Sequence, residues 1–201
     1  MIDCTYNFDQ NQYKLCGFVY LDCDTNSSKL AAVGYMDVEN EDNLTFLFTQ
    51  LKEISNSGDN LLFMTDKDFK AMRSLQQVFI HSKILLCLFH VLQYMRTIIA
   101  SACNCTVDVK NSLSTSFSKL VYSRSSEEFS LRNAAFKNEC DGVLVLPPGN
   151  QDYVELPSYY TRNWENCPEM WAIHLRSNLT TLSDNTNNRV ERFVKLEHRS
   201  F

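Results

Sequence analysis

The alternation of apolar and polar positions predicts an antiparallel hairpin near the start of the chain. Residues 13–22 are apolar on both alternating faces and rich in β-branched and aromatic side chains, a pattern typical of a strand in a covered sheet. A second apolar run, residues 29–36, follows a short polar turn. We expect these two runs to pair with each other as antiparallel strands.

From Asp42 onward the apolar spacing changes to three and four residues, which predicts a helix. The helix is expected to end at Ser-Gly-Asp, residues 57–59, because glycine favours helix termination. The apolar stripe predicted to face the sheet consists of Leu44, Leu47, Phe48, Leu51 and Ile54.

Two strand–helix units follow. Residues 61–64 form a short apolar run, and the helix after it is expected to carry Phe69, Met72, Leu75 and Phe79 on one face. Residues 84–88 form the next strand, followed by a helix with an apolar stripe within residues 91–99. Consecutive strand–helix units favour a parallel pair of strands joined by a right-handed crossover.

The second half of the chain has weaker periodicity. Its first part, residues 101–163, is predicted to be mostly helical with a loop, and contains a helix over residues 126–139. A further helix is expected over residues 164–182. The more basic segment 185–201 is predicted to form a terminal helix.

Composition narrows the class of protein. Of the 201 residues 44% are hydrophobic and 21% are charged, which predicts a packed globular core. The net charge of −5 argues against holding nucleic acid by bulk electrostatics, because neutralising phosphates requires an excess of Lys and Arg. The longest apolar stretch, residues 84–89, is too short to span a membrane. The first ten residues lack the pattern of a signal peptide, so we expect a protein that is not secreted.

Eight cysteines are scattered along the chain without paired spacing, and several lie in apolar runs. We therefore expect reduced, buried thiols rather than a disulfide framework. Cys87 and His90 form a single C-x-x-H pair. A zinc site needs four ligands, and no second pair has a suitable spacing. The expectation is that both side chains pack or hydrogen-bond locally and that this segment binds no zinc.

Acidic residues at strand ends are the candidates for metal chemistry. Asp3 lies in the first apolar strand fragment, and Asp66 directly follows the strand of residues 61–64. Open α/β sheets bind ligands at the carboxyl edge of their strands. Two carboxylates on adjacent strands could share a divalent cation such as Mg²⁺ or Mn²⁺. The alternative is that Asp66 caps the helix that follows it.

Four sequence blocks stand out along the chain. They are I-D-C-T-Y-N-x(5)-Y-K-L at residues 2–15, F-M-T-D-K-D-F at 63–69, L-L-C-L-F-H-V-L at 85–92 and T-N-N-R-V-E-R-F at 186–193. In this order the blocks resemble Mutator-like (MULE) transposases. The two middle blocks are most similar to the transposase-derived domain of the ZSWIM group of SWIM-type zinc-finger proteins.

The resemblance implies an α/β fold of the RNase H-like type. Such a fold has a mixed five-stranded sheet, with strands one to three antiparallel and strands four and five parallel, flanked by helices and interrupted by a helical insertion. Residues 1–103 are then the RNase H-like core with a truncated first strand, and residues 104–183 are the mostly helical insertion. Residues 184–201 are the terminal helix that completes the core.

The resemblance also implies site residues. In the transposases a DDE triad binds two Mg²⁺ ions, and the corresponding residues here are Asp3, Asp66 and Glu191. The family also has a C-x-x-H beside the active site, matched by Cys87 and His90. Competitors for the third acidic position are Glu127, Glu128 and Glu139.

The resemblance implies a transposase-like domain, and we expect a domesticated one without catalytic activity, because the first strand is short and the SWIM zinc-finger pattern is absent. It would belong to a ZSWIM-type protein, or to a gene fragment lacking the zinc finger, and would act in the nucleus or cytoplasm through protein partners. DNA would be contacted through regions outside this chain. Two alternatives stay open, a Mg²⁺- or Mn²⁺-dependent DDE strand transferase or nuclease core, and an unrelated soluble α/β interaction domain.

Overall fold

The structure, a computed structural model, divides into two compact units, one containing residues 1–87 and the other residues 88–181. For Asp3, Cys4, Thr5 and Leu21 it describes the backbone alone. The residues that it describes are 1–5, 13–22, 24–25, 27–56, 58, 60–176 and 179.

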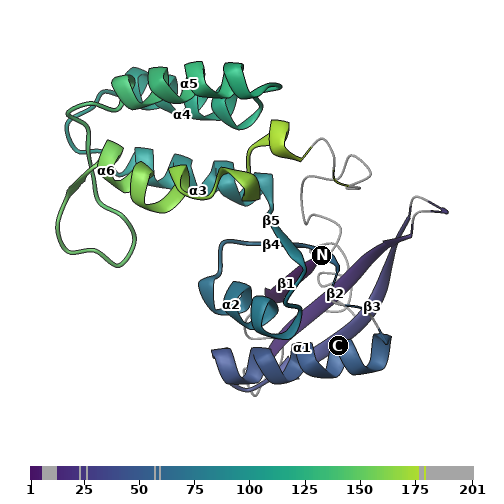
Figure 1. The fold of residues 1–201 in the computed structure, drawn as a ribbon. Helices are drawn as coiled ribbons and strands as arrows, with labels where there is room; N and C mark the ends of the chain where they lie inside the picture. Colours follow the sequence, from purple (N-terminus) through teal and green to yellow (C-terminus); the bar gives the residue numbers. More distant parts are fainter. Residues whose placement is uncertain are drawn as a thin grey trace. The chain divides into compact units, whose positions relative to one another are not determined.

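The first unit begins with a three-stranded antiparallel sheet in the order β1-β2-β3 (Figure 1). The strands are β1 (Ile2–Thr5), β2 (Lys14–Asp22) and β3 (Ser27–Met36). In the turn between β2 and β3, the Asp22 carboxylate accepts hydrogen bonds from the Asp24 backbone N–H at 3.0 Å and from the Thr25 hydroxyl at 2.9 Å. The hairpin predicted from residues 13–22 and 29–36 is confirmed.

Helix α1 (Glu41–Ser55) packs on this sheet through part of its predicted stripe. Leu44 and Phe48 are fully buried, and the Phe48 ring meets the Phe18 ring edge-on at 5.9 Å. Ile54 does not face the sheet, because its exposed fraction is 80%. The helix also ends earlier than predicted, since Asn56, with φ of 49°, adopts the left-handed conformation expected of the glycine.

The parallel pair that was predicted next is β4 (Leu62–Thr65) and β5 (Lys83–Leu86), connected through α2 (Phe69–Val78). Leu75 and Phe79 are buried as expected, and Phe79 lies 4.9 Å from the Phe63 ring. Phe69, at the start of the helix, is 56% exposed, so its predicted place on the apolar face is wrong.

The strands of the first unit form two separate hydrogen-bonded ladders rather than one continuous five-stranded sheet. One ladder contains β1, β2 and β3, and the other contains β4 and β5. The two ladders lie next to each other, because β1 contacts β4. The fold shown is therefore mixed α/β with small sheets.

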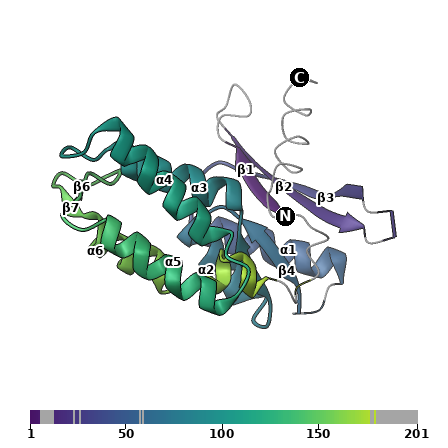
Figure 2. The same cartoon turned by 90° about the horizontal axis from the view of Figure 1, so that it is seen from above.

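The second unit is built on three helices, α3 (Leu88–Ala100), α4 (Val107–Val121) and α5 (Ser126–Glu139). Helices α4 and α5 run side by side in Figures 1 and 2. Their shared core is aromatic. Phe117 of α4 is in ring contact, with centroid distances of 5.4 to 6.3 Å, with Phe136, Tyr160, Trp164 and Trp171.

Short elements complete this unit. A two-stranded antiparallel ladder of β6 (Leu144–Val145) and β7 (Val154–Glu155) leads into α6 (Leu156–Tyr160). One π-helical turn (Thr161–Glu165) and two 3₁₀ turns (Pro168–Met170 and Ile173–Leu175) follow.

The single helix predicted over residues 164–182 is wrong for the part of it that the structure describes. Pro168 has no backbone N–H and cannot continue an α-helical ladder from Trp164. The predicted terminal helix, residues 185–201, lies outside the described residues.

Within the described residues, no helix is long and apolar enough to cross a membrane. Six cysteines are free thiols there, and Cys16, Cys87 and Cys140 are buried as expected of reduced core residues.

Candidate metal centre

The carboxyl ends of β4 and β5 place Asp66 and Cys87 next to each other. In the parallel register Thr65 is opposite Leu86, the last residue of each strand. The ladder continues one step further, because the Cys87 backbone N–H donates to the Thr65 carbonyl at 2.9 Å. Asp66 and Cys87 are therefore the first residues beyond two paired strand ends, at the edge where parallel sheets collect ligands.

Asp66 does not cap the helix that follows it. The N-cap of α2 is Asp68, whose carboxylate accepts from the Lys70 backbone N–H at 2.7 Å and from that of Ala71 at 3.4 Å. The capping alternative for Asp66 is thus wrong. Asp66 is half-buried at the edge of the β4–β5 pair.

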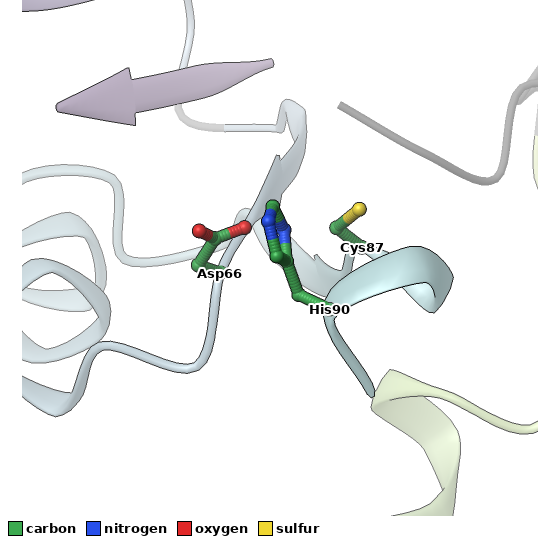
Figure 3. A group of neighbouring side chains, drawn as sticks. All are labelled: Asp66, Cys87 and His90. Atoms are coloured by element: carbon green, nitrogen blue, oxygen red, sulfur yellow. The ribbon is translucent and has the colours of Figure 1, made fainter. Parts of the chain in front are cut away.

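His90 joins this pair through local chain geometry. Helix α3 begins at Leu88, directly after Cys87, so His90 lies in its first turn, three residues beyond the cysteine. The ligand atoms of Asp66, Cys87 and His90 all lie within 4.8 Å of one another. In the view of Figure 3 the imidazole stands between the aspartate carboxylate and the cysteine side chain.

The three side chains differ in burial. Cys87 has an exposed fraction of 0%, and its neighbours Leu86 and Leu88 are each 1% exposed. Asp66 and His90 are half-buried. The cysteine is therefore the most buried member of the group, and His90 Nδ1 is buried with it.

The donors of this group differ from the carboxylates of Asp3, Asp66 and Glu191 that the resemblance assigns to Mg²⁺. Mg²⁺ demands near-octahedral coordination by oxygen and usually keeps several waters. Within the group Asp66 alone supplies oxygen, and the other two donors are a sulfur and an imidazole nitrogen. Thiolate and imidazole are ligands that zinc and other transition metals prefer.

For the other two acidic residues of the predicted triad, Asp3 and Glu191, the triad stays a prediction. The backbone of Asp3 lies in β1, opposite Gly17, and its side chain is outside the description. Glu191 lies outside the described residues. Asp66 is therefore the member of the triad whose surroundings are known.

The competing glutamates belong to α5. Glu127 and Glu128 are in its first turn, where acidic side chains favour the helix dipole, and Glu139 is its last residue. Glu128 forms an ion pair with Arg132 at 2.6 Å, one turn along the same helix. These contacts give Glu128 a role in stabilising α5.

All three residues were candidates from the sequence, and the resemblance implied that the C-x-x-H pair lies beside the active site, but a metal site shared by the three was not predicted. Cys87 and His90 were grouped as a two-ligand motif, and Asp66 was assigned to a carboxylate site. The signal that links them is positional, because Asp66 and Cys87 each directly follow a short apolar run of a strand–helix unit.

Part of the chain matches the model of a known family. Residues 1–94 match the MULE transposase domain, a range that includes Asp3, Asp66, Cys87 and His90. The match supports a relation to Mutator-like transposases and a transposase-derived origin for this part of the chain. No curated protein matches the chain.

Proposed function

We propose that this chain is a domesticated, transposase-derived domain of the ZSWIM type that acts through protein contacts and does not cleave DNA. Its core is RNase H-like in this proposal. Support comes from the antiparallel β1-β2-β3 ladder, the parallel β4-β5 pair and the contact of β1 with β4. These features support the proposal, although β1 and β4 belong to separate ladders.

The observation that carries the proposal is the distribution of charge. Residues 1–94, which match the transposase domain, contain 12 acidic and 7 basic residues, while residues 95–201 contain 12 of each. The whole net charge of −5 therefore falls on the segment that would have to hold DNA. Because binding to phosphates depends on Lys and Arg, this segment is a poor surface for a DNA substrate.

The ZSWIM context and a nuclear location are proposed from the similarity of two sequence blocks to the ZSWIM group. The blocks T-D-K-D-F at residues 65–69 and L-L-C-L-F-H-V-L at 85–92 contain the three residues of the candidate metal centre. A domain that keeps these blocks in a segment of net negative charge fits a role in protein recognition within a larger nuclear protein.

A second candidate function is a metal-dependent DNA strand transferase or nuclease core. The observation that favours it is the position of Asp66, just beyond the carboxyl end of β4 and released from helix capping by Asp68. In this alternative Asp3 and Glu191 supply the other carboxylates.

A DNA-cleavage assay separates the two functions. The full chain is incubated with supercoiled plasmid and with branched DNA in Mg²⁺ and in Mn²⁺, beside the variants Asp66→Asn and Asp68→Asn. Asp68→Asn is the matched control, because asparagine and aspartate are equally good N-caps, and it lies two residues from Asp66. We expect all three proteins to leave the DNA intact.

The strand transferase would be established by the opposite pattern. Wild type and Asp68→Asn would then nick the DNA in a metal-dependent manner, and Asp66→Asn would not. Nicking that is equal in all three proteins identifies a contaminating nuclease, and repeating the assay on further purified protein resolves it.

A further inference from the structure

We propose that Asp66, Cys87 and His90 form a Zn²⁺ site at the carboxyl ends of β4 and β5. This inference goes beyond the proposed function and does not rest on it, because neither an interaction domain nor a DDE core requires zinc at this position. It rests on the identity of the three donors, their separation and the local backbone that holds them.

The three donor atoms are of the kinds that zinc takes as ligands in proteins. Zn²⁺ is bound in proteins by cysteine sulfur, histidine nitrogen and aspartate or glutamate oxygen, and this group offers one of each. Three protein ligands leave a fourth tetrahedral position for water or for a side chain of a partner. Near the C-x-x-H pair in the sequence there is no third ligand. Asp66 supplies one, because it lies next to Cys87 across the paired strands β4 and β5.

The separation of the donors is close to what zinc needs. With bonds of about 2.0–2.3 Å in a tetrahedron, ligand atoms stand roughly 3.3–3.6 Å apart. The three donor atoms here lie within 4.8 Å of one another. Asp66 and His90 are half-buried, and binding of an ion would draw their donors closer by rotation about the side-chain bonds.

The backbone fixes the innermost ligand. The Cys87 N–H is held by the Thr65 carbonyl at 2.9 Å, and the cysteine stands between two buried leucines, Leu86 and Leu88. Ligands carried on rigid elements make precise metal sites. A bound ion would meet the buried thiolate on one side and the carboxylate of half-buried Asp66 on the other.

Occupation by zinc has a consequence for the transposase ancestry. The Asp66 carboxylate corresponds to the second acidic residue of the DDE triad, and binding to zinc would engage it. The same residue would then serve a site with sulfur and nitrogen ligands in place of a site made of carboxylates.

Cobalt substitution tests the proposal directly. The full chain is stripped of metal with a chelator under reducing conditions and titrated with Co²⁺, whose bond to a thiolate gives an intense charge-transfer absorption. We expect this absorption to saturate at one equivalent, to disappear on addition of Zn²⁺ and to withstand millimolar Mg²⁺.

Variants assign the ligands. Cys87→Ser should abolish the thiolate absorption, and Cys16→Ser is its matched control, because Cys16 is also 0% exposed and lies in the same unit. Asp66→Asn and His90→Asn should each weaken Co²⁺ binding by about tenfold or more. His81→Asn, an exposed histidine between α2 and β5, is the control for His90 and should leave binding unchanged.

Several results would overturn the site. These are Co²⁺ binding without thiolate absorption, an absorption that survives in Cys87→Ser, and one that is lost in Cys16→Ser. If Cys87→Ser fails to fold by circular dichroism, the half-buried His90→Asn decides, and unchanged affinity in that variant contradicts the proposal. DNA cleavage is a separate readout, so failure of the zinc site and failure of the proposed function are distinguishable.

Discussion

At the residue scale, burial sets how the cysteines react. Cys140 is 0% exposed, and burial is the main cause that raises the pKa of its thiol to about 12, assisted by the nearby charge of Glu139. Cys103 is exposed. Since the thiolate is the reactive form, Cys140 should react far more slowly than Cys103.

The measurement is labelling of the native protein with a thiol reagent at pH 8, followed by peptide mass spectrometry. Cys103 should be modified first and Cys140 only after unfolding in denaturant. The folded chain retains the Cys140 proton to higher pH than the unfolded chain does, so this residue lowers stability as the pH rises above the ordinary thiol value. Equal labelling rates for both cysteines in the native state would contradict the burial of Cys140.

Individual residues of the candidate metal centre were predictable from the sequence, but their association was not. Two aspartates two residues apart, Asp66 and Asp68, are equally plausible caps by residue type, and the turn geometry assigns that role to Asp68. Cys87 and His90 are recognisable as a local pair. Their association with Asp66 depends on the register of β4 against β5, and a register across strands is not encoded in local spacing.

At the element scale, the packing of α1 on the sheet depends on a glycine. A methyl group on Gly34 of β3 would lie 2.7 Å from Leu47 Cδ2 and 3.0 Å from Leu47 Cγ, closer than carbon atoms approach in packed proteins. Gly34→Ala should therefore displace Leu47 and lower the free energy of unfolding by about 1–3 kcal/mol. Denaturant unfolding followed by circular dichroism measures the change.

Two further variants make this test specific. Gly58→Ala is the control, since nothing lies within 4 Å of the position of its added methyl group, and its stability should be unchanged or slightly higher. Leu47→Ala removes the side chain that the methyl group would meet. In the double variant Gly34→Ala/Leu47→Ala the loss should be smaller than the sum of the two single losses. Strict additivity would show that the two residues do not meet.

Helices with a long apolar stripe were predictable from the sequence. Helix α4 was not predicted as a separate helix, because it contains many Ser and Thr residues, which are weak helix formers. In the structure these hydroxyls bond to carbonyls one turn back, as Ser114 does to Lys110 at 2.8 Å and Thr115 to Asn111 at 2.9 Å. The stripe of Leu113, Phe117 and Leu120 was present, but the polar composition concealed it.

At the scale of the whole molecule, strand order was more predictable than sheet continuity. Strand–helix periodicity predicts which segments form β4 and β5 and that they run parallel, because a helix connects them. Whether β1 joins β4 by hydrogen bonds depends on contacts between segments about sixty residues apart, which periodicity does not specify. The structure has the two strands in contact but in separate ladders.

The two compact units have separate cores, and the chain carries a natural reporter for one of them. Both tryptophans, Trp164 and Trp171, belong to the second unit, where each is 0% exposed and packs against Phe117. Tryptophan fluorescence therefore follows unfolding of the second unit, while circular dichroism follows both. Since units with their own cores can unfold separately, the wild type should show different midpoints by the two methods.

The variant Gly34→Ala sharpens this last prediction, because Gly34 and Leu47 both lie in the first unit. It should shift the circular dichroism transition to lower denaturant and leave the fluorescence midpoint where it is in the wild type. Phe117→Leu removes a ring from the aromatic core of the second unit. This variant should shift the fluorescence midpoint to lower denaturant. If Gly34→Ala shifts the fluorescence midpoint to lower denaturant, the two units unfold as one cooperative body. A clash in the first unit would then destabilise the second unit as well.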